Sequence, residues 1–155
     1  NLNVEEWLSG WGNDKSGARM EEKNGIAYVI GEFDEQNWGR CFRSIDINLD
    51  EYNTLELEVV KIKGEGYIIL KNENLSDGAD KGFVRLNPKP DKPGKYIYDL
   101  KKITALTGEN TFEIELGIVN NNGNSNKDYY IAIKSLKLTS EKKDIEKDKK
   151  IKKKK

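Results

Sequence analysis

Glu113 and Glu115 stand two residues apart in an alternating segment, which is a spacing that could support acid–base chemistry. Carboxyls at positions i and i+2 on one strand face lie about 6–7 Å apart, close to the separations found in glycoside hydrolases. Such enzymes place the two carboxyls on opposite sides of a cleft, however, and here they share one strand. Paired glutamates on a strand are usually cross-strand partners of Lys or Arg. We favour that interpretation and keep a hydrolase or lyase acting through Glu113 and Glu115 as an alternative.

The sequence contains no histidine. This removes the commonest general base and the commonest transition-metal ligand, and it excludes a Ser-His-Asp or Cys-His nucleophile. Cys41 is the single cysteine, so an internal disulfide is excluded as well. It is either a reactive thiol or a small buried residue of a strand, and we favour the buried residue.

The elements that would position these side chains are strands. Apolar and polar residues alternate through residues 110–119 and again through 129–138, which is the period of a half-buried strand. A one-residue slip at Lys134 and Ser135 predicts a β-bulge, and Asn24-Gly25 predicts a tight hairpin. Residues 73–81 and the proline-containing 87–94 are expected to be loops, and 101–110 have room for one helical turn. The expected strands cover residues 1–8, 18–22, 26–30, 40–47, 54–63, 67–72, 82–86, 95–100, 110–119 and 129–138.

This spacing of strands predicts an all-β sandwich. Strands recur about every ten residues with turn signals between them, and no helical apolar stripe is convincing. Apolar and charged residues each make up 35% of the chain. The core must therefore be thin, which suits two sheets that each bury alternate residues.

Residues 141–155 differ from the rest of the chain in composition. They hold nine lysines, four acidic residues and two apolar ones, whereas the preceding residues hold 18 basic and 23 acidic residues. A segment so poor in apolar residues cannot bury enough surface to become ordered. We expect a domain over residues 1–139 followed by a disordered Lys-rich tail or linker over 140–155, with a basic arm for an acidic surface as the alternative.

Charge and hydropathy also bear on partners and processing. The mildly acidic body argues against a nucleic-acid partner, and no apolar run approaches the length of a membrane span. The chain starts at Asn1 without an initiator methionine or a signal peptide, so we interpret it as a trimmed or mature fragment.

The order and spacing of the strands over about residues 4–139 resemble jelly-roll carbohydrate-binding modules of the galactose-binding-like superfamily, which are attached to bacterial polysaccharide hydrolases. The segments that carry the resemblance are residues 43–47, 52–59, 94–100, 112–117 and 129–138. It implies a jelly-roll β-sandwich of two antiparallel sheets and a secreted or cell-surface bacterial protein. The implied function is non-catalytic, monomeric binding of a polysaccharide, most simply a β-linked glucan or mannan, beside an attached glycoside hydrolase.

The resemblance requires no cofactor, although many of these modules hold a structural calcium near an aromatic-Ile-Asp-Asn-Ile run. Here Ala132 and Lys134 lie in the corresponding run, which contains no carboxylate. Four glutamates near the first strands could still supply oxygen ligands, but ordinary surface charge is the favoured interpretation, and the metal site stays unknown. These glutamates are Glu5, Glu6, Glu21 and Glu22.

A sugar-binding site needs an aromatic platform for the apolar face of the ring and planar polar groups for its hydroxyls. Trp11 and Trp38 lie in Gly- and Asn-rich segments and are the candidate platforms, although Trp38 fits the core equally well; Trp7 is expected in the core. The polar candidates are strand residues that point away from the core, together with amides that follow Val119. They are Arg40, Lys71, Arg85, Glu113, Glu115, Asn120, Asn122 and Asn124. A β-sandwich that binds other proteins through its edges and basic tail is the remaining alternative.

Overall fold

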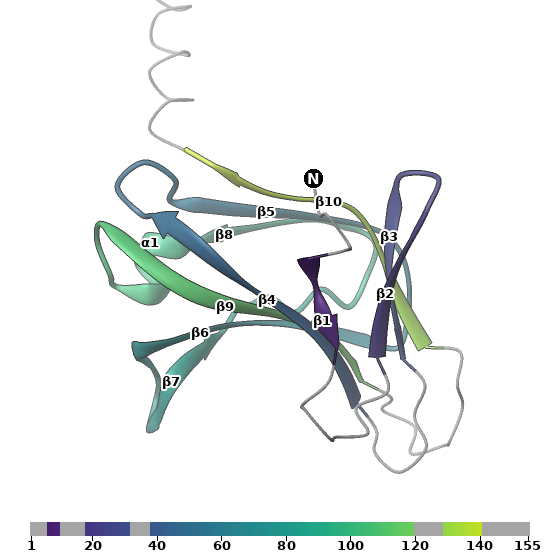
Figure 1. Ribbon diagram of the computed structural model, residues 1–155, viewed down its shortest axis with the longest axis horizontal. Helices are drawn as coiled ribbons and strands as arrows, with labels where there is room; N and C mark the ends of the chain where they lie inside the picture. The colour runs from purple at the N-terminus through teal and green to yellow at the C-terminus, as the bar shows by residue number, and fades with distance from the viewer. Residues whose placement is uncertain (1–5, 10–17, 32–37, 120–128, 141–155) are drawn as a thin grey trace, which may run out of the picture.

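Ten strands form two five-stranded antiparallel sheets in the computed structural model, which describes residues 6–9, 18–31, 38–119 and 129–140 (Figure 1). Sheet A has the order β1-β4-β9-β6-β7, and sheet B has the order β2-β3-β10-β5-β8. The strands of sheet A are β1 (Leu8–Ser9), β4 (Trp38–Asn48), β9 (Glu109–Val119), β6 (Glu65–Asp77) and β7 (Asp80–Arg85). Those of sheet B are β2 (Ala18–Lys23), β3 (Ile26–Gly31), β10 (Tyr129–Thr139), β5 (Thr54–Lys63) and β8 (Gly94–Asp99).

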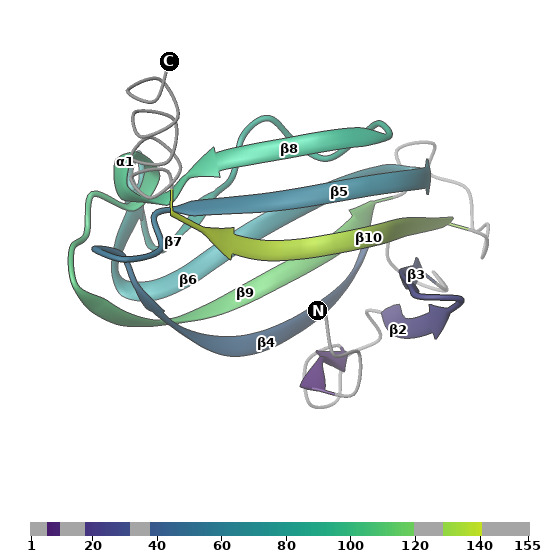
Figure 2. The same ribbon diagram turned by 90° about the horizontal axis from the view of Figure 1, so that it is seen from above.

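The two sheets lie face to face, with β5, β8 and β10 over β4, β6 and β9 (Figures 1 and 2). From β3 to β6, and again from β7 to β10, each strand is followed by one in the opposite sheet. The predicted all-β sandwich of two antiparallel sheets is confirmed. The two long alternating segments, β9 and β10, belong to different sheets, so residues 120–128 connect the sheets.

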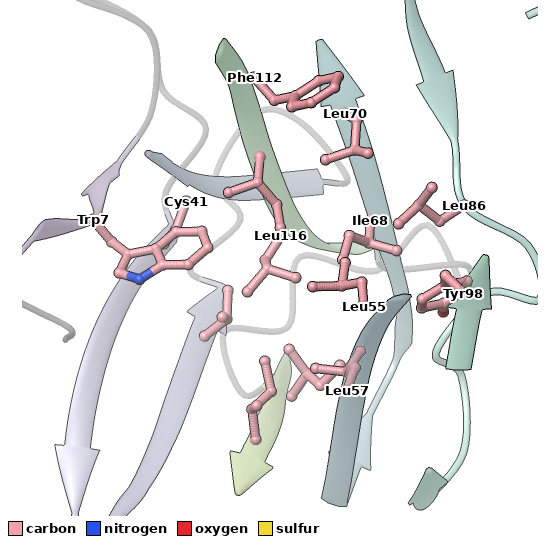
Figure 3. Packing of buried hydrophobic residues seen from close by; sticks show 14 of the residues in the cluster. Trp7, Cys41, Leu55, Leu57, Ile68, Leu70, Leu86, Tyr98, Phe112 and Leu116 are labelled. Atoms are coloured by element: carbon pink, nitrogen blue, oxygen red, sulfur yellow. The ribbon is translucent and has the colours of Figure 1, made fainter. Parts of the chain in front are cut away.

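One apolar layer between the sheets holds the structure together. The strands from β2 to β10 contribute alternate side chains to it, as their sequence period requires. Cys41 and Trp7 are both buried there, so the predictions that placed them in the core are confirmed. Figure 3 shows part of this layer, with labels on Trp7, Cys41, Leu55, Leu57, Ile68, Leu70, Leu86, Tyr98, Phe112 and Leu116.

Local sequence signals account for several details. Asn24 and Gly25 have φ of 53° and 79°, and they close the hairpin of β2 and β3 as predicted. The register between β10 and β5 shifts between Ile133 and Ser135, which confirms the bulge. The expected helical turn is α1 (Leu100–Thr104), whose first turn is capped by the Asp99 carboxylate accepting a hydrogen bond from the Lys102 amide.

The prediction of a loop over residues 73–81 is wrong. Strand β6 continues to Asp77 and turns at Gly78, with φ of 62°, into β7, which begins at Asp80. Leu75 is buried in this extension. The register shift after Lys71 breaks the alternation of apolar residues, and that break made an Asn- and Glu-rich strand resemble a loop.

Candidate functional site

The outer face of sheet A brings together the five charged strand residues that the sequence singled out. Arg40 comes from β4, Lys71 from β6, Arg85 from β7, and Glu113 and Glu115 from β9. All five alternate with side chains that enter the core, so they point away from it. Two rows of paired residues hold four of them: Ser44–Glu113–Lys71–Phe83 and Phe42–Glu115–Ile69–Arg85.

Four of these residues form one charge network. Arg40 Nη1 lies 2.5 Å from Glu115 Oε1 and 3.7 Å from Glu113 Oε2, and Lys71 Nζ lies 3.0 Å and 3.4 Å from the same two oxygens. The Arg40 and Glu115 side chains are 3% and 5% exposed, whereas those of Lys71 and Glu113 are 29% and 31% exposed. The network is therefore a covered Arg–Glu pair with a more open Lys–Glu pair beside it. Each glutamate bridges to a cation on a neighbouring strand, which favours the cross-strand interpretation over an acid pair.

Tyr67 lies across the neighbouring strand, above the backbone of Gly117. The two residues are paired in register, and Gly117 is paired in turn with Arg40. A Cβ at position 117 would overlap the ring and hydroxyl of Tyr67, so only glycine permits this approach. Burial raises the pKa of the Tyr67 hydroxyl, and the nearby Glu115 carboxylate raises it further through its charge and a hydrogen bond. The hydroxyl thus stays protonated, and Glu115, which is itself paired with Arg40, holds the ring in place.

A hollow of about 400 Å³ opens beside Tyr67, between residues 65–69 of β6 and residues 85–89, and reaches buried residues such as Ile68 and Leu86. Apolar surface from Ile69 and Val119 lines it, with Glu65, Arg85 and Lys89 at its polar positions. The charges are matched there too, because Lys89 lies 2.9 Å from Glu65 and Arg85 lies 3.1 Å from Asp77. The face therefore offers an aromatic ring, apolar surface and many hydrogen-bonding groups with little net charge.

Sequence reasoning missed the aromatic residues of this face. Phe42, Tyr67 and Phe83 are half-buried on β4, β6 and β7, and the guanidinium carbons of Arg40 and Arg85 lie 4.3 Å and 4.9 Å from the ring centres of Phe42 and Phe83. The signal was present, because each ring alternates with core residues in the way that the charged residues do.

The tryptophans and the amides are only partly described. Trp38 occupies the first position of β4 and is paired with Val119, which is itself paired with Glu65. Its backbone thus lies in a row with two residues that line the hollow, while its side chain falls outside the described part. Trp11 and the amides Asn120, Asn122 and Asn124 lie outside the described residues. Sugar contact by any of the predicted residues stays a prediction.

Of the three described glutamates considered for calcium, Glu6 and Glu21 have other partners, and Glu22 is exposed on β2. Glu6 lies 2.7 Å from Arg43, and Glu21 accepts a hydrogen bond of 2.8 Å from Arg19; Glu5 lies outside the described residues. No group of three or more metal-ligating side chains occurs among residues 6–9, 18–31, 38–119 and 129–140. In that same part of the chain, no helix has the length and apolar character of a membrane span.

No family model matches the sequence. No curated protein matches it either. Among solved structures, similarity extends to a low-affinity xylan-binding module, CBM86, from the gut symbiont Roseburia intestinalis, with 14% identity, 88% of this chain and 92% of that chain covered, and a TM-score of 0.47.

Two further solved structures are similar to the chain. A mutant of the family 29 carbohydrate-binding module CBM29-2 is 18% identical over 88% of this chain and 82% of its own, with a TM-score of 0.48. The module TmCBM61, in complex with beta-1,4-galactotriose, is 14% identical over 89% of this chain and 90% of its own, with a TM-score of 0.45. All three are carbohydrate-binding modules, the class that the sequence resembles. At this identity and similarity they assign neither a ligand nor a site to this chain, and the proposal below rests on its own residues.

Proposed function

We propose that this chain is a non-catalytic module that binds a neutral polysaccharide on the outer face of sheet A. The observation that carries the proposal is the Tyr67 ring, held over Gly117 beside a hollow. A pyranose ring presents an apolar C–H face that packs on an aromatic ring, and its hydroxyls need donors and acceptors around the edge. Tyr67 supplies the ring, and the half-exposed Lys71 and Glu113 supply donors and acceptors.

The charge balance of the face favours a neutral ligand. Arg40, Lys71, Arg85 and Lys89 each lie within ion-pair distance of a carboxylate. A ligand with its own charge would have to compete with these existing pairs, whereas hydroxyls can add to them. A β-linked glucan or mannan fits this requirement.

Arg40 and Glu115 have a different role from the one expected of them. Because their side chains are almost fully covered, we assign them to positioning: Arg40 holds Glu115, and Glu115 holds the Tyr67 hydroxyl. Direct contacts are assigned to Tyr67, Lys71, Glu113 and Arg85. Trp38, paired with Val119 in a neighbouring row of sheet A, is assigned a further contact. In the cell the module would be secreted by a bacterium and would keep an attached glycoside hydrolase near its substrate, where local concentration raises the rate.

The test is affinity electrophoresis and calorimetry with soluble β-glucans and β-mannans. Tyr67→Ala should weaken binding by about 1–3 kcal/mol, the scale of a lost aromatic anchor. Tyr67→Phe keeps the ring but loses the hydroxyl that Glu115 holds, so its affinity should fall several-fold at most and less than that of Tyr67→Ala. Tyr52→Ala, at an exposed tyrosine in the turn between β4 and β5, is the matched control and should change nothing.

Gly117→Ala provides a second variant in case Tyr67→Ala unfolds, because the added methyl group must displace the Tyr67 ring. Wild-type affinity in both well-folded variants would contradict the proposal. So would release of reducing ends from the polysaccharide that disappears in Glu113→Gln, since that result would make the chain a hydrolase. Migration that no polysaccharide retards would favour the protein-binding alternative.

A further inference from the structure

The outer face of sheet B carries a second group of aromatic and charged residues. Lys23, Tyr28, Tyr130 and Lys61 come from β2, β3, β10 and β5, which are consecutive strands of this sheet (Figure 1). We call these four residues the tyrosine–lysine band. With strands about 4.8 Å apart, the band crosses about 14 Å of the sheet.

Contacts run through the whole band. The ring centres of Tyr28 and Tyr130 are 6.0 Å apart with a 53° angle between the planes. Lys23 Nζ lies 5.8 Å from the Tyr28 ring centre, and Lys61 Nζ lies 5.9 Å from that of Tyr130. Each end of the aromatic pair therefore has an ammonium group beside it.

Ala132 explains why the two rings form one surface. It is paired with Tyr28 on β3 and with Lys61 on β5, on the side of β10 that faces away from the core. Despite that position its exposure is 0%, so the surrounding side chains cover it. The small residue leaves room for Tyr28, its partner on β3, and for Tyr130, two positions before it on β10, so the two rings meet over the sheet.

The charges of this face are unbalanced, in contrast with those of sheet A. Within residues 6–9, 18–31, 38–119 and 129–140, Lys23, Lys61 and the adjacent Lys63 have no carboxylate within ion-pair distance, and all three are exposed. Glu21, on the same face, is paired with Arg19 at 2.8 Å. Lys23 and Lys61 thus place two positive charges beside the aromatic pair, and Lys63 adds a third over the adjacent Tyr129 ring at 5.8 Å, on a body that is otherwise acidic.

From this arrangement we propose that the outer face of sheet B is a second binding surface, for an acidic polysaccharide whose sugar carboxylates pair with Lys23 and Lys61 while its rings lie on Tyr28 and Tyr130. A glycan with one carboxylate per sugar matches charges spaced across an aromatic surface. A nucleic acid, with denser charge, would meet repulsion from the acidic body. The two faces would then bind separate ligands, or different regions of one heterogeneous glycan.

The experiment compares polygalacturonate with its fully methyl-esterified form, which has the same backbone without the charge. The wild-type protein should bind polygalacturonate and bind the ester at least about tenfold more weakly. Raising the ionic strength to about 0.15 M should reduce the difference, because it shortens the screening length to about 8 Å.

The decisive variant replaces Lys23, Lys61 and Lys63 with Gln. Its matched control replaces Lys95, Lys134 and Lys137, which lie in the same sheet, change the net charge equally, and are paired with Glu56 or Glu58 at 3.7–3.9 Å. The first triple variant should lose about tenfold in affinity for polygalacturonate, and the control should lose less than about twofold. Tyr130→Ala should weaken binding further, and Tyr67→Ala should leave it unchanged, which separates this surface from the one on sheet A.

Three results would overturn the proposal. Equal losses in the two triple variants would mean that net charge alone attracts the polymer. Equal affinity for polygalacturonate and its methyl ester would show that the lysines do not pair with the sugar carboxylates. Single-stranded DNA that binds as tightly as polygalacturonate, with the same dependence on Lys23, Lys61 and Lys63, would make the face a general polyanion surface instead.

Discussion

The buried pair of Arg40 and Glu115 gives the sharpest test of how sheet A is built. We consider Arg40→Met, Glu115→Leu and the double variant, all of which keep approximate side-chain volume. Removing one partner of a buried ion pair leaves an uncompensated charge and costs about 3–5 kcal/mol, whereas replacing both by apolar residues is often neutral or stabilising. The groups around the two charges decide which single variant loses more unfolding free energy.

Glu115→Leu should lose about 3–5 kcal/mol of unfolding free energy. It leaves the guanidinium of Arg40 covered, with the Glu113 oxygen 3.7 Å away. Arg40→Met should lose less, about 2–3 kcal/mol, because Lys71 Nζ still lies 3.0 Å from Glu115 and neutralises it. The double variant should come within about 1 kcal/mol of the wild type.

Urea unfolding of the four proteins measures these differences and their coupling energy. The reasoning is refuted if each single variant behaves as a surface substitution, within about 0.5 kcal/mol, or if the double variant loses the sum of the two single losses. The double variant also tests function, since Tyr67 loses the carboxylate that its hydroxyl bonds. We expect its polysaccharide affinity to fall several-fold although its stability recovers.

Three further predictions concern Cys41 in the core, Trp38 at the start of β4, and the tail over residues 141–155. Burial raises the pKa of Cys41 to about 12 from 9.0, although the charge of Arg40 opposes the shift. Above pH 9 the unfolded chain therefore ionises a thiol that the folded state keeps neutral. The contribution of this neutral thiol to the free energy of unfolding is complete below pH 9 and disappears as the pH rises towards 12. Between pH 9 and 11 the wild type should lose up to about 3 kcal/mol more unfolding free energy than Cys41→Ala. Urea unfolding at the two pH values measures this, and equal losses in the two proteins would contradict it. Trp38→Ala should weaken polysaccharide binding by about 1–3 kcal/mol with little change in melting temperature; unchanged affinity with a loss of roughly 3–5 kcal/mol in stability would place it in the core and leave Trp11 as the candidate platform. Truncation after Ser140 should alter neither stability nor binding of neutral glucan or mannan, and a loss of either would make residues 141–155 part of the domain.

Strand content was predictable because it depends on local periodicity. The alternation of apolar residues located the long strands and told which side chains face outward, and Asn24-Gly25 located a hairpin through the φ angles that these residues tolerate. The extension of β6 through Leu75 was not predictable in this way. There, the irregular pairing after Lys71 is set by the partner strand, and a single strand's sequence does not contain it.

The candidate site shows the same division. Sequence alternation placed Arg40, Lys71 and Glu115 on the outer sides of their strands, and the absence of histidine excluded several kinds of active site. Sequence could not say that Arg40 and Glu115 would be covered, or that Tyr67 would lie over Gly117, because these contacts join residues 75 and 50 positions apart. Only the order of strands within a sheet and their register bring such residues together. Tertiary structure therefore decided which outward side chains became neighbours, and with that, which face carries matched charges and which carries three exposed lysines.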